Sequence, residues 1–174
     1  MRKAGGGMVR RGGKIGYTGR LEDKEMRAVI QRVSRASVWI SGRRVSEIEQ
    51  GLLILLSVGK DDELRDQEYL TGKILNLRIF EDDKGKMNRS VCDAGGALMV
   101  ISQFTLHGDC RRGHRPSFID AEKRPRAAEL FDQTLEMLRA SGLEVRTGVF
   151  GANMSVESVN RGPVTILIDS RKLF

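Results

Sequence analysis

The run Leu52-Leu53-Ile54-Leu55-Leu56-Ser57-Val58 decides the fold of this chain. It is apolar without alternation, which is typical of a central strand buried on both faces of its sheet, and Gly59 ends it. Its unbroken aliphatic part, Leu52 to Leu56, is far shorter than the roughly 20 residues that span a bilayer. The run therefore predicts a buried strand and argues against a membrane protein.

Strands and helices alternate around this run. Strands are predicted over 27–33, 37–40, 44–48, 52–58, 78–81, 97–104, 143–149, 154–159 and 164–168. One helix is predicted over 63–76 with Asp61 as its cap, and a second begins at Pro125 and ends at Gly142. The simplest architecture for this order is α/β: one domain in which a mixed sheet carries two helices.

Composition bounds the class of protein. The chain has 174 residues, of which 40% are hydrophobic and 5% aromatic, and only two cysteines. These values indicate one globular domain without a disulfide scaffold, which favours a reducing, cytoplasmic setting. The low aromatic content argues against a surface that binds single strands by repeated base stacking.

The charge is uneven along the chain. Residues 1–25 carry +4 of the formal net charge of +7, and residues 26–174 carry the remaining +3. The first segment also holds seven of the 20 glycines and few large apolar side chains, so it cannot offset its chain entropy by burial. We predict a flexible, basic, Gly-rich extension over 1–25 and a folded domain over 26–174. A basic arm that touches nucleic acid is the functional alternative for the extension.

Two local patterns contain residue types found in zinc sites and in catalytic relays, but their spacing does not support either function. His107, Asp109, Cys110 and His114 are zinc-ligand types, but their spacing matches no standard zinc site. Thr105, His107 and Asp109 alternate as in a catalytic relay, yet side chains two apart on a strand stand side by side. We expect a solvated polar loop over 107–118, with neither a metal nor another cofactor.

Longer motifs carry a family resemblance. They are Met26–Val33, the run Ser102-Gln103-Phe104-Thr105-Leu106, the stretch Arg112–Phe118, the stretch Thr147–Met154, and Asn160-Arg161-Gly162-Pro163-Val164-Thr165. Together and in this order they resemble the D-aminoacyl-tRNA deacylase (D-tyrosyl-tRNA(Tyr) deacylase) family over 26–174.

The resemblance implies an activity and an assembly. The family hydrolyses the ester between a D-amino acid, or glycine, and the end of a tRNA, which proofreads mischarged tRNA. It is a mixed α/β fold that pairs as a homodimer with its active sites at the interface. Gly162-Pro163 would be the family's Gly-cis-Pro element, which enters the partner's site and excludes an L side chain with backbone carbonyls. On the residues alone, Gly162-Pro163 is a plain turn into the last strand.

The resemblance also assigns the pocket. Ser102, Gln103, Phe104 and Thr105 would line it as the catalytic stretch, with backbone N–H groups facing the ester carbonyl. Phe150 and Met154 would pack around the terminal adenosine, and Arg32 would hold the Gly-cis-Pro element. The implied mechanism uses no protein nucleophile, because the 2′-hydroxyl of the terminal ribose assists the attack of water. The residues alone leave Phe150 and Met154 as core, and Arg32 as a surface cation.

Three alternatives remain from the sequence. The first is a non-catalytic nucleic-acid-binding module with residues 1–25 as its arm. The second is a zinc hydrolase built on His107, Cys110 and His114. The third is an interaction domain without chemistry.

Overall fold

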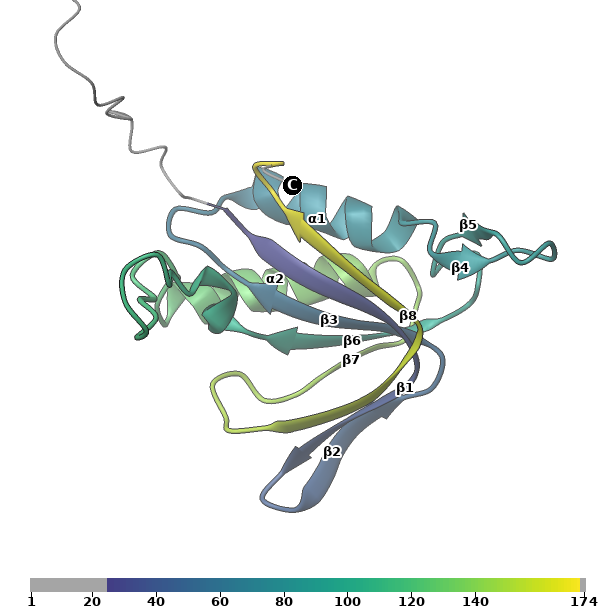
Figure 1. Cartoon of the computed structure of the whole chain (residues 1–174), viewed down its shortest axis with the longest axis horizontal. Helices are drawn as coiled ribbons and strands as arrows, with labels where there is room; N and C mark the ends of the chain where they lie inside the picture. The colour runs from purple at the N-terminus through teal and green to yellow at the C-terminus, as the bar shows by residue number, and fades with distance from the viewer. Residues whose placement is uncertain (1–24, 173–174) are drawn as a thin grey trace, which may run out of the picture.

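The computed structural model describes residues 25–172 (Figure 1). The predicted extension over 1–25 lies outside the described residues except for Glu25, and it stays a prediction. Glu25 itself is fully buried.

A six-stranded mixed sheet forms the centre of the fold. The strands are β1 (Arg27–Ile40), β2 (Arg43–Ile48), β3 (Gly51–Ser57), β6 (Ala97–Ser102), β7 (Val145–Thr147) and β8 (Ser155–Asp169). Strand β1 pairs along one edge with β3 and then with β2, and along its other edge with β8. β6 and then β7 continue the sheet beyond β3. The β3–β6 and β6–β7 pairs are parallel, whereas β1 is antiparallel to each of its partners.

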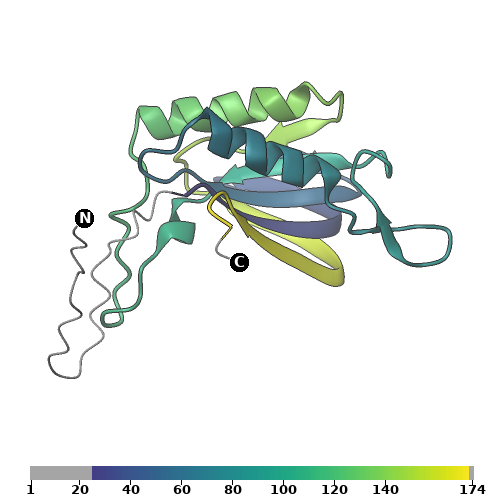
Figure 2. The same ribbon diagram turned by 90° about the horizontal axis from the view of Figure 1, so that it is seen from above.

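Two helices cover one face of this sheet. Helices α1 (Leu64–Asn76) and α2 (Arg126–Arg139) lie side by side on it (Figure 2). A small hairpin, β4 (Phe80–Glu81) with β5 (Met87–Arg89), projects at one end, and a short 3-10 helix, η1 (Phe104–His107), follows β6. The predicted mixed sheet with two helices is confirmed.

The central run is buried on both faces, as predicted. Leu52, Ile54 and Leu56 pack into the cluster beneath the helices, whereas Leu53 packs into a second cluster on the opposite face. Gly51 is the first residue of β3, and no side chain fits at this position because a Cβ would overlap the carbonyl group of Ala97 on β6. The parallel β3–β6 contact therefore depends on this glycine.

Several boundaries differ from the sequence prediction: the strands predicted over 78–81 and 143–149 are shorter, and three differences have a structural cause. The strands predicted over 27–33 and 37–40 are one strand, β1, which pairs first with β3 and then with β2. The last two predicted strands are likewise one strand, β8, because register shifts occur within it instead of a turn. β6 ends at Ser102 because the chain turns into η1 there.

The start of α1 also differs. Glu63 is the residue at its N-cap, and it exchanges hydrogen bonds with Asp66 in a capping box. Asp61, the predicted cap, instead has a positive φ of 61° in the preceding turn. Over residues 25–172, none of the helices has the length and apolar content to cross a membrane.

Candidate functional site

A pocket of about 300 Å³ opens where β3 and β6 end. Five of the residues that the resemblance assigned to the active site line it: Ser102, Gln103, Phe104, Phe150 and Met154. Thr105 follows Phe104 in η1 and is exposed. The structure therefore brings together two segments that are almost 50 residues apart in the chain.

The first segment is shaped by the end of β6. The N–H of Gln103 donates to the Leu56 carbonyl at 2.8 Å, which keeps this residue against β3 as the chain leaves the sheet. The Gln103 side-chain amide donates to Thr105 Oγ1 at 2.5 Å. Phe104 is 56% exposed, and its ring meets Phe118 edge-on at 5.1 Å. The turn thus presents polar groups and an aromatic ring at the pocket.

The second segment is the connection from β7 to β8. The ring of Phe150 lies 5.6 Å from that of Phe131 on α2, and the Arg124 guanidinium lies 4.9 Å from its centre. Arg124 also donates to the Phe150 carbonyl. Phe150 therefore packs against the core and lines the pocket at once, so the two interpretations of this residue do not exclude each other.

Gly162 and Pro163 lie in a bulge of β8, which corrects the simple interpretation as a turn between two strands. Gln31 pairs with Thr165 and Val33 with Asn160, so residues 161–164 of β8 loop out opposite a single β1 residue. The Gly162–Pro163 peptide bond is cis, as the resemblance implied. We call residues 161–164 the β8 bulge.

Side chains on both strands fix this bulge. The Asn160 amide closes its base, since its Oδ1 accepts from the Val164 N–H at 2.7 Å and its Nδ2 donates to the Val164 carbonyl at 3.2 Å. Arg32 lies opposite and is only 6% exposed, so it is not a surface cation. Its Nε donates to the Arg161 carbonyl at 3.0 Å, and its Nη1 to the Ile79 carbonyl at 2.7 Å.

Within one chain the bulge and the pocket are separate. Arg32 pairs with Leu52 on β3, whereas Ser102 pairs with Leu56. Four residues along a strand correspond to roughly 13 Å. Arg32 and Arg161 line a depression of their own, of about 280 Å³. The predicted site residues thus form two groups in the single chain.

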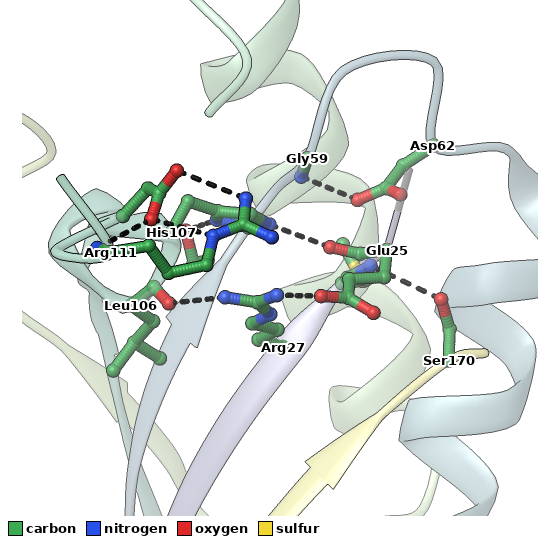
Figure 3. A network of polar contacts seen from close by, with 11 residues as sticks. Glu25, Arg27, Gly59, Asp62, Leu106, His107, Arg111 and Ser170 are labelled. Carbon is green, nitrogen blue, oxygen red and sulfur yellow. Dashed lines mark hydrogen bonds and ion pairs between the residues drawn. The ribbon is translucent and has the colours of Figure 1, made fainter. Parts of the chain in front are cut away.

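His107 corrects the prediction of a solvated loop. It is 3% exposed, and its Nδ1 lies 2.6 Å from Ser57 Oγ while its Nε2 lies 2.7 Å from the Glu25 carbonyl oxygen (Figure 3). A carbonyl only accepts, so Nε2 carries the proton and Nδ1 accepts from the Ser57 hydroxyl. Burial, reinforced by the nearby charge of Arg27, lowers the pKa of His107 to about 4. The imidazole is therefore neutral near pH 7.

The same contacts engage both ring nitrogens of His107, which leaves neither of them available for the relay or for zinc. Thr105 and His107 belong to a 3-10 turn, not to an extended strand. Among residues 25–172, no three His, Cys, Asp or Glu side chains are grouped as metal ligands. No sequence signal pointed to the partners of His107, since Ser57 and Glu25 lie 50 and 82 residues away.

A network of polar contacts that includes two buried carboxylates, those of Glu25 and Asp62, lies beside this histidine (Figure 3). The Glu25 carboxylate pairs with Arg27, whose Nη1 donates to the Leu106 carbonyl at 2.8 Å (Figure 3). Asp62 is fully buried and accepts from the Gly59 N–H at 2.6 Å. Burial is the main cause that raises the pKa of Asp62 to about 7. The network ties the start of β1 to η1, beside the pocket.

Comparison of this sequence with known proteins defines the class of protein to which the chain belongs. Relatives from Fervidobacterium nodosum and Koribacter versatilis, each named D-aminoacyl-tRNA deacylase, are 54% and 58% identical over 149 residues. Each alignment covers 86% of this chain and 100% of the relative. Such deacylases are enzymes that hydrolyse an ester bond. Residues 29–169 match the family model described as D-Tyr-tRNA(Tyr) deacylase, and this chain belongs to that family.

Solved structures agree on the fold. One solved structure, described as c-Myc DNA Unwinding Element Binding Protein, superposes with a TM-score of 0.77 and is 40% identical in sequence. The alignment covers 82% of this chain and 97% of the other chain. Another, described as a probable eukaryotic D-amino acid tRNA deacylase, has a TM-score of 0.72 at 16% identity over 83% and 99%. The second supports the architecture alone.

Proposed function

We propose that this chain hydrolyses the ester bond of D-aminoacyl-tRNA, and of glycine mischarged on tRNA, and releases the amino acid and free tRNA. The observation that carries the proposal is the pocket at the ends of β3 and β6, where Ser102, Gln103, Phe104, Phe150 and Met154 converge in a chain of this family. We infer that the enzyme works in the cytoplasm, where its tRNA substrate is used, and that residues 26–174 form its catalytic domain.

The pocket suits an aminoacylated nucleoside. Its volume of about 300 Å³ falls at the lower end of small-molecule sites, roughly 300–1,000 Å³. Phe150 and Met154 offer an apolar wall for the terminal adenine. Backbone N–H groups of the turn that follows Gln103, whose own N–H donates to the Leu56 carbonyl, would donate to the oxyanion that forms when water attacks the ester carbonyl.

The chemistry needs no side-chain nucleophile. Thr105 Oγ1 is engaged by the Gln103 amide, and the imidazole of His107 is held between Ser57 and Glu25. In the proposed reaction the 2′-hydroxyl of the terminal ribose assists a water molecule. The water oxygen adds to the carbonyl carbon, and one of its protons passes by way of the 2′-hydroxyl to the ribose 3′ oxygen. As the tetrahedral intermediate collapses, the bond from the carbonyl carbon to that oxygen breaks, which leaves the free amino acid and a 3′-hydroxyl on the tRNA. The protein positions these groups and stabilises the oxyanion.

A second copy of the chain would complete the site. The β8 bulge does not reach the pocket of its own chain, and β8 exposes Val156, Val159 and Leu167 (37%, 44% and 55% exposed). A homodimer formed through this strand would bury these side chains and bring the Gly162–Pro163 bulge of one copy to the pocket of the other. There its backbone carbonyls would crowd an L side chain, whereas a D side chain or a hydrogen would fit.

The test is amino acid release from D-tyrosyl-tRNA and, separately, from L-tyrosyl-tRNA. We expect release from the D substrate alone, and loss of release when the terminal ribose lacks its 2′-hydroxyl. T105A should retain most of the rate; complete loss in a folded T105A protein would contradict the RNA-assisted mechanism. Binding of both tRNAs without any release would identify a non-catalytic RNA-binding module instead.

A further inference from the structure

The positive charge of the described domain is concentrated in one segment. Residues 26–174 carry a net charge of +3, and residues 107–126 account for all of it. This segment, which we call the basic segment, holds six cations and three carboxylates: Arg111, Arg112, Arg115, Lys123, Arg124, Arg126, Asp109, Asp120 and Glu122. Elsewhere in 26–174 the charges balance. Such focusing is typical of a surface that meets a polyanion.

The basic segment forms a projecting loop with a closed base. The N–H of Asp109 donates to the Ser117 carbonyl at 2.8 Å, and the reverse bond is 2.9 Å. Residues 110–116 are therefore held out from the sheet, and all of them are exposed. Figure 2 shows this loop at the end of the molecule away from the β4–β5 hairpin.

One cation of the loop, Arg111, has a carboxylate partner. Arg111 Nε and Nη2 donate to the two carboxylate oxygens of Asp109 at 2.9 and 3.0 Å. These hydrogen bonds lower the pKa of Asp109 to about 2, so this carboxylate stays ionised across the physiological range. Asp109 therefore neutralises Arg111 within the loop, whereas Arg112 and Arg115 are exposed cations.

The basic segment also borders the pocket at several points. Phe118 packs edge-on against Phe104, which lines the pocket. Glu122 lines the pocket itself, and Arg124 lies over Phe150. A nucleic acid whose last nucleotide entered the pocket would therefore pass beside these cations.

We propose that the basic segment binds the phosphates of the tRNA acceptor end that precede the terminal nucleotide. The inference rests on the proposed function, because it requires the aminoacylated nucleotide to occupy the pocket. Arg112, Arg115 and Lys123 contact the phosphates from the exposed side, while the exposed ring of Phe104 offers a face on which a base stacks. In this arrangement the basic segment binds the RNA, whereas the pocket carries out the hydrolysis of the ester.

The experiment compares two triple variants with the same loss of charge. R112A/R115A/K123A removes cations of the basic segment, and the control R43A/K84A/K86A removes exposed cations from β2 and the β4–β5 hairpin. Each is assayed on D-tyrosyl-tRNA and on D-tyrosyl-adenosine, which keeps the ester but lacks the acceptor strand. Circular dichroism and Tm establish that both variants fold.

The segment variant should lose about tenfold or more in kcat/KM on the tRNA, mainly through KM, and should keep its rate on the nucleoside ester. Three lost phosphate contacts should also reduce the slope of log kcat/KM against log salt by about 2. The control should match the parent chain on both substrates. Equal losses in the two variants, or none in the segment variant, would overturn the proposal.

A separate readout keeps the two proposals distinguishable. Binding of uncharged tRNA, followed by filter retention against salt concentration, requires no ester cleavage. If the parent chain hydrolyses neither substrate, the proposed function fails. The surface assignment would then still stand if the segment variant alone weakened tRNA binding, and would fall if it did not.

Discussion

Asp62 and His107 give opposite contributions to the pH dependence of stability. His107 has a folded-state pKa of about 4 against 6.5 unperturbed. As pH falls through this interval, the unfolded chain takes up a proton that the folded chain does not, so the free energy of unfolding falls. Asp62 has a folded-state pKa of about 7 against 3.8. As pH rises through that interval, its contribution to stability is lost.

The magnitudes follow from the size of each interval. One pKa unit corresponds to about 1.4 kcal/mol, so His107 alone would remove about 3 kcal/mol between pH 6.5 and pH 4. Asp62 would contribute a slope of the same size and opposite sign in this window. In the parent chain, the proton that His107 takes up in the unfolded state is matched by the proton that Asp62 takes up in the folded state, so the free energy of unfolding changes little over this window. We therefore predict that the contribution of His107 is uncompensated in D62N. On acidification from pH 6.5 to pH 4, the free energy of unfolding of D62N should fall by about 3 kcal/mol more than that of the parent chain.

The assay is urea unfolding of the parent and variants from below pH 4 to above pH 7. D62N keeps an oxygen that accepts from Gly59, and H107Q should show the opposite slope, with stability that falls as pH rises. E68Q, on the exposed face of α1, is the control. If D62N and H107Q both followed the parent's pH profile, the burial of these two groups would not act as argued.

Three further outcomes are expected. G51A should destabilise the fold by about 3 kcal/mol in urea unfolding, because its Cβ meets the Ala97 carbonyl; a change below about 1 kcal/mol would contradict the close β3–β6 approach. R32K should lower kcat/KM on D-tyrosyl-tRNA about tenfold or more, since it loses the bond to the Arg161 carbonyl; full activity would show that Arg32 does not support the bulge. F150A should raise KM for D-tyrosyl-adenosine, and an unchanged KM would restrict Phe150 to the core.

Much of the fold follows from local pattern. The apolar run over 52–58 predicted a central strand buried on both faces. In the structure this strand, β3, pairs with β1 along one edge and with β6 along the other. The two long strands were each divided in the prediction because polar or Gly-Pro positions imitate turns. In β1 the strand changes partner instead of ending, and in β8 the extra residues form a bulge. Such features depend on the partner strand, which local sequence does not contain.

The site shows the same division. The motif that begins at Ser102 was located from sequence through a family resemblance, and the structure places most of it around one pocket. The burial of His107 could not be predicted, because a histidine among Gly, Asp and Arg residues has the local signature of a solvated loop. Its environment is created by Ser57 and Glu25, which only the tertiary fold brings near.

The most direct test of the central claim is the enantiomer ratio of the parent chain and of P163A. Initial rates on D-tyrosyl-tRNA and L-tyrosyl-tRNA, with the same tRNA, give kcat/KM for each ester. We predict a strong preference for the D ester in the parent chain and a reduced ratio in P163A, through slower turnover of the D ester or turnover of the L ester. Unchanged rates on both esters in P163A would contradict a filter built on the β8 bulge.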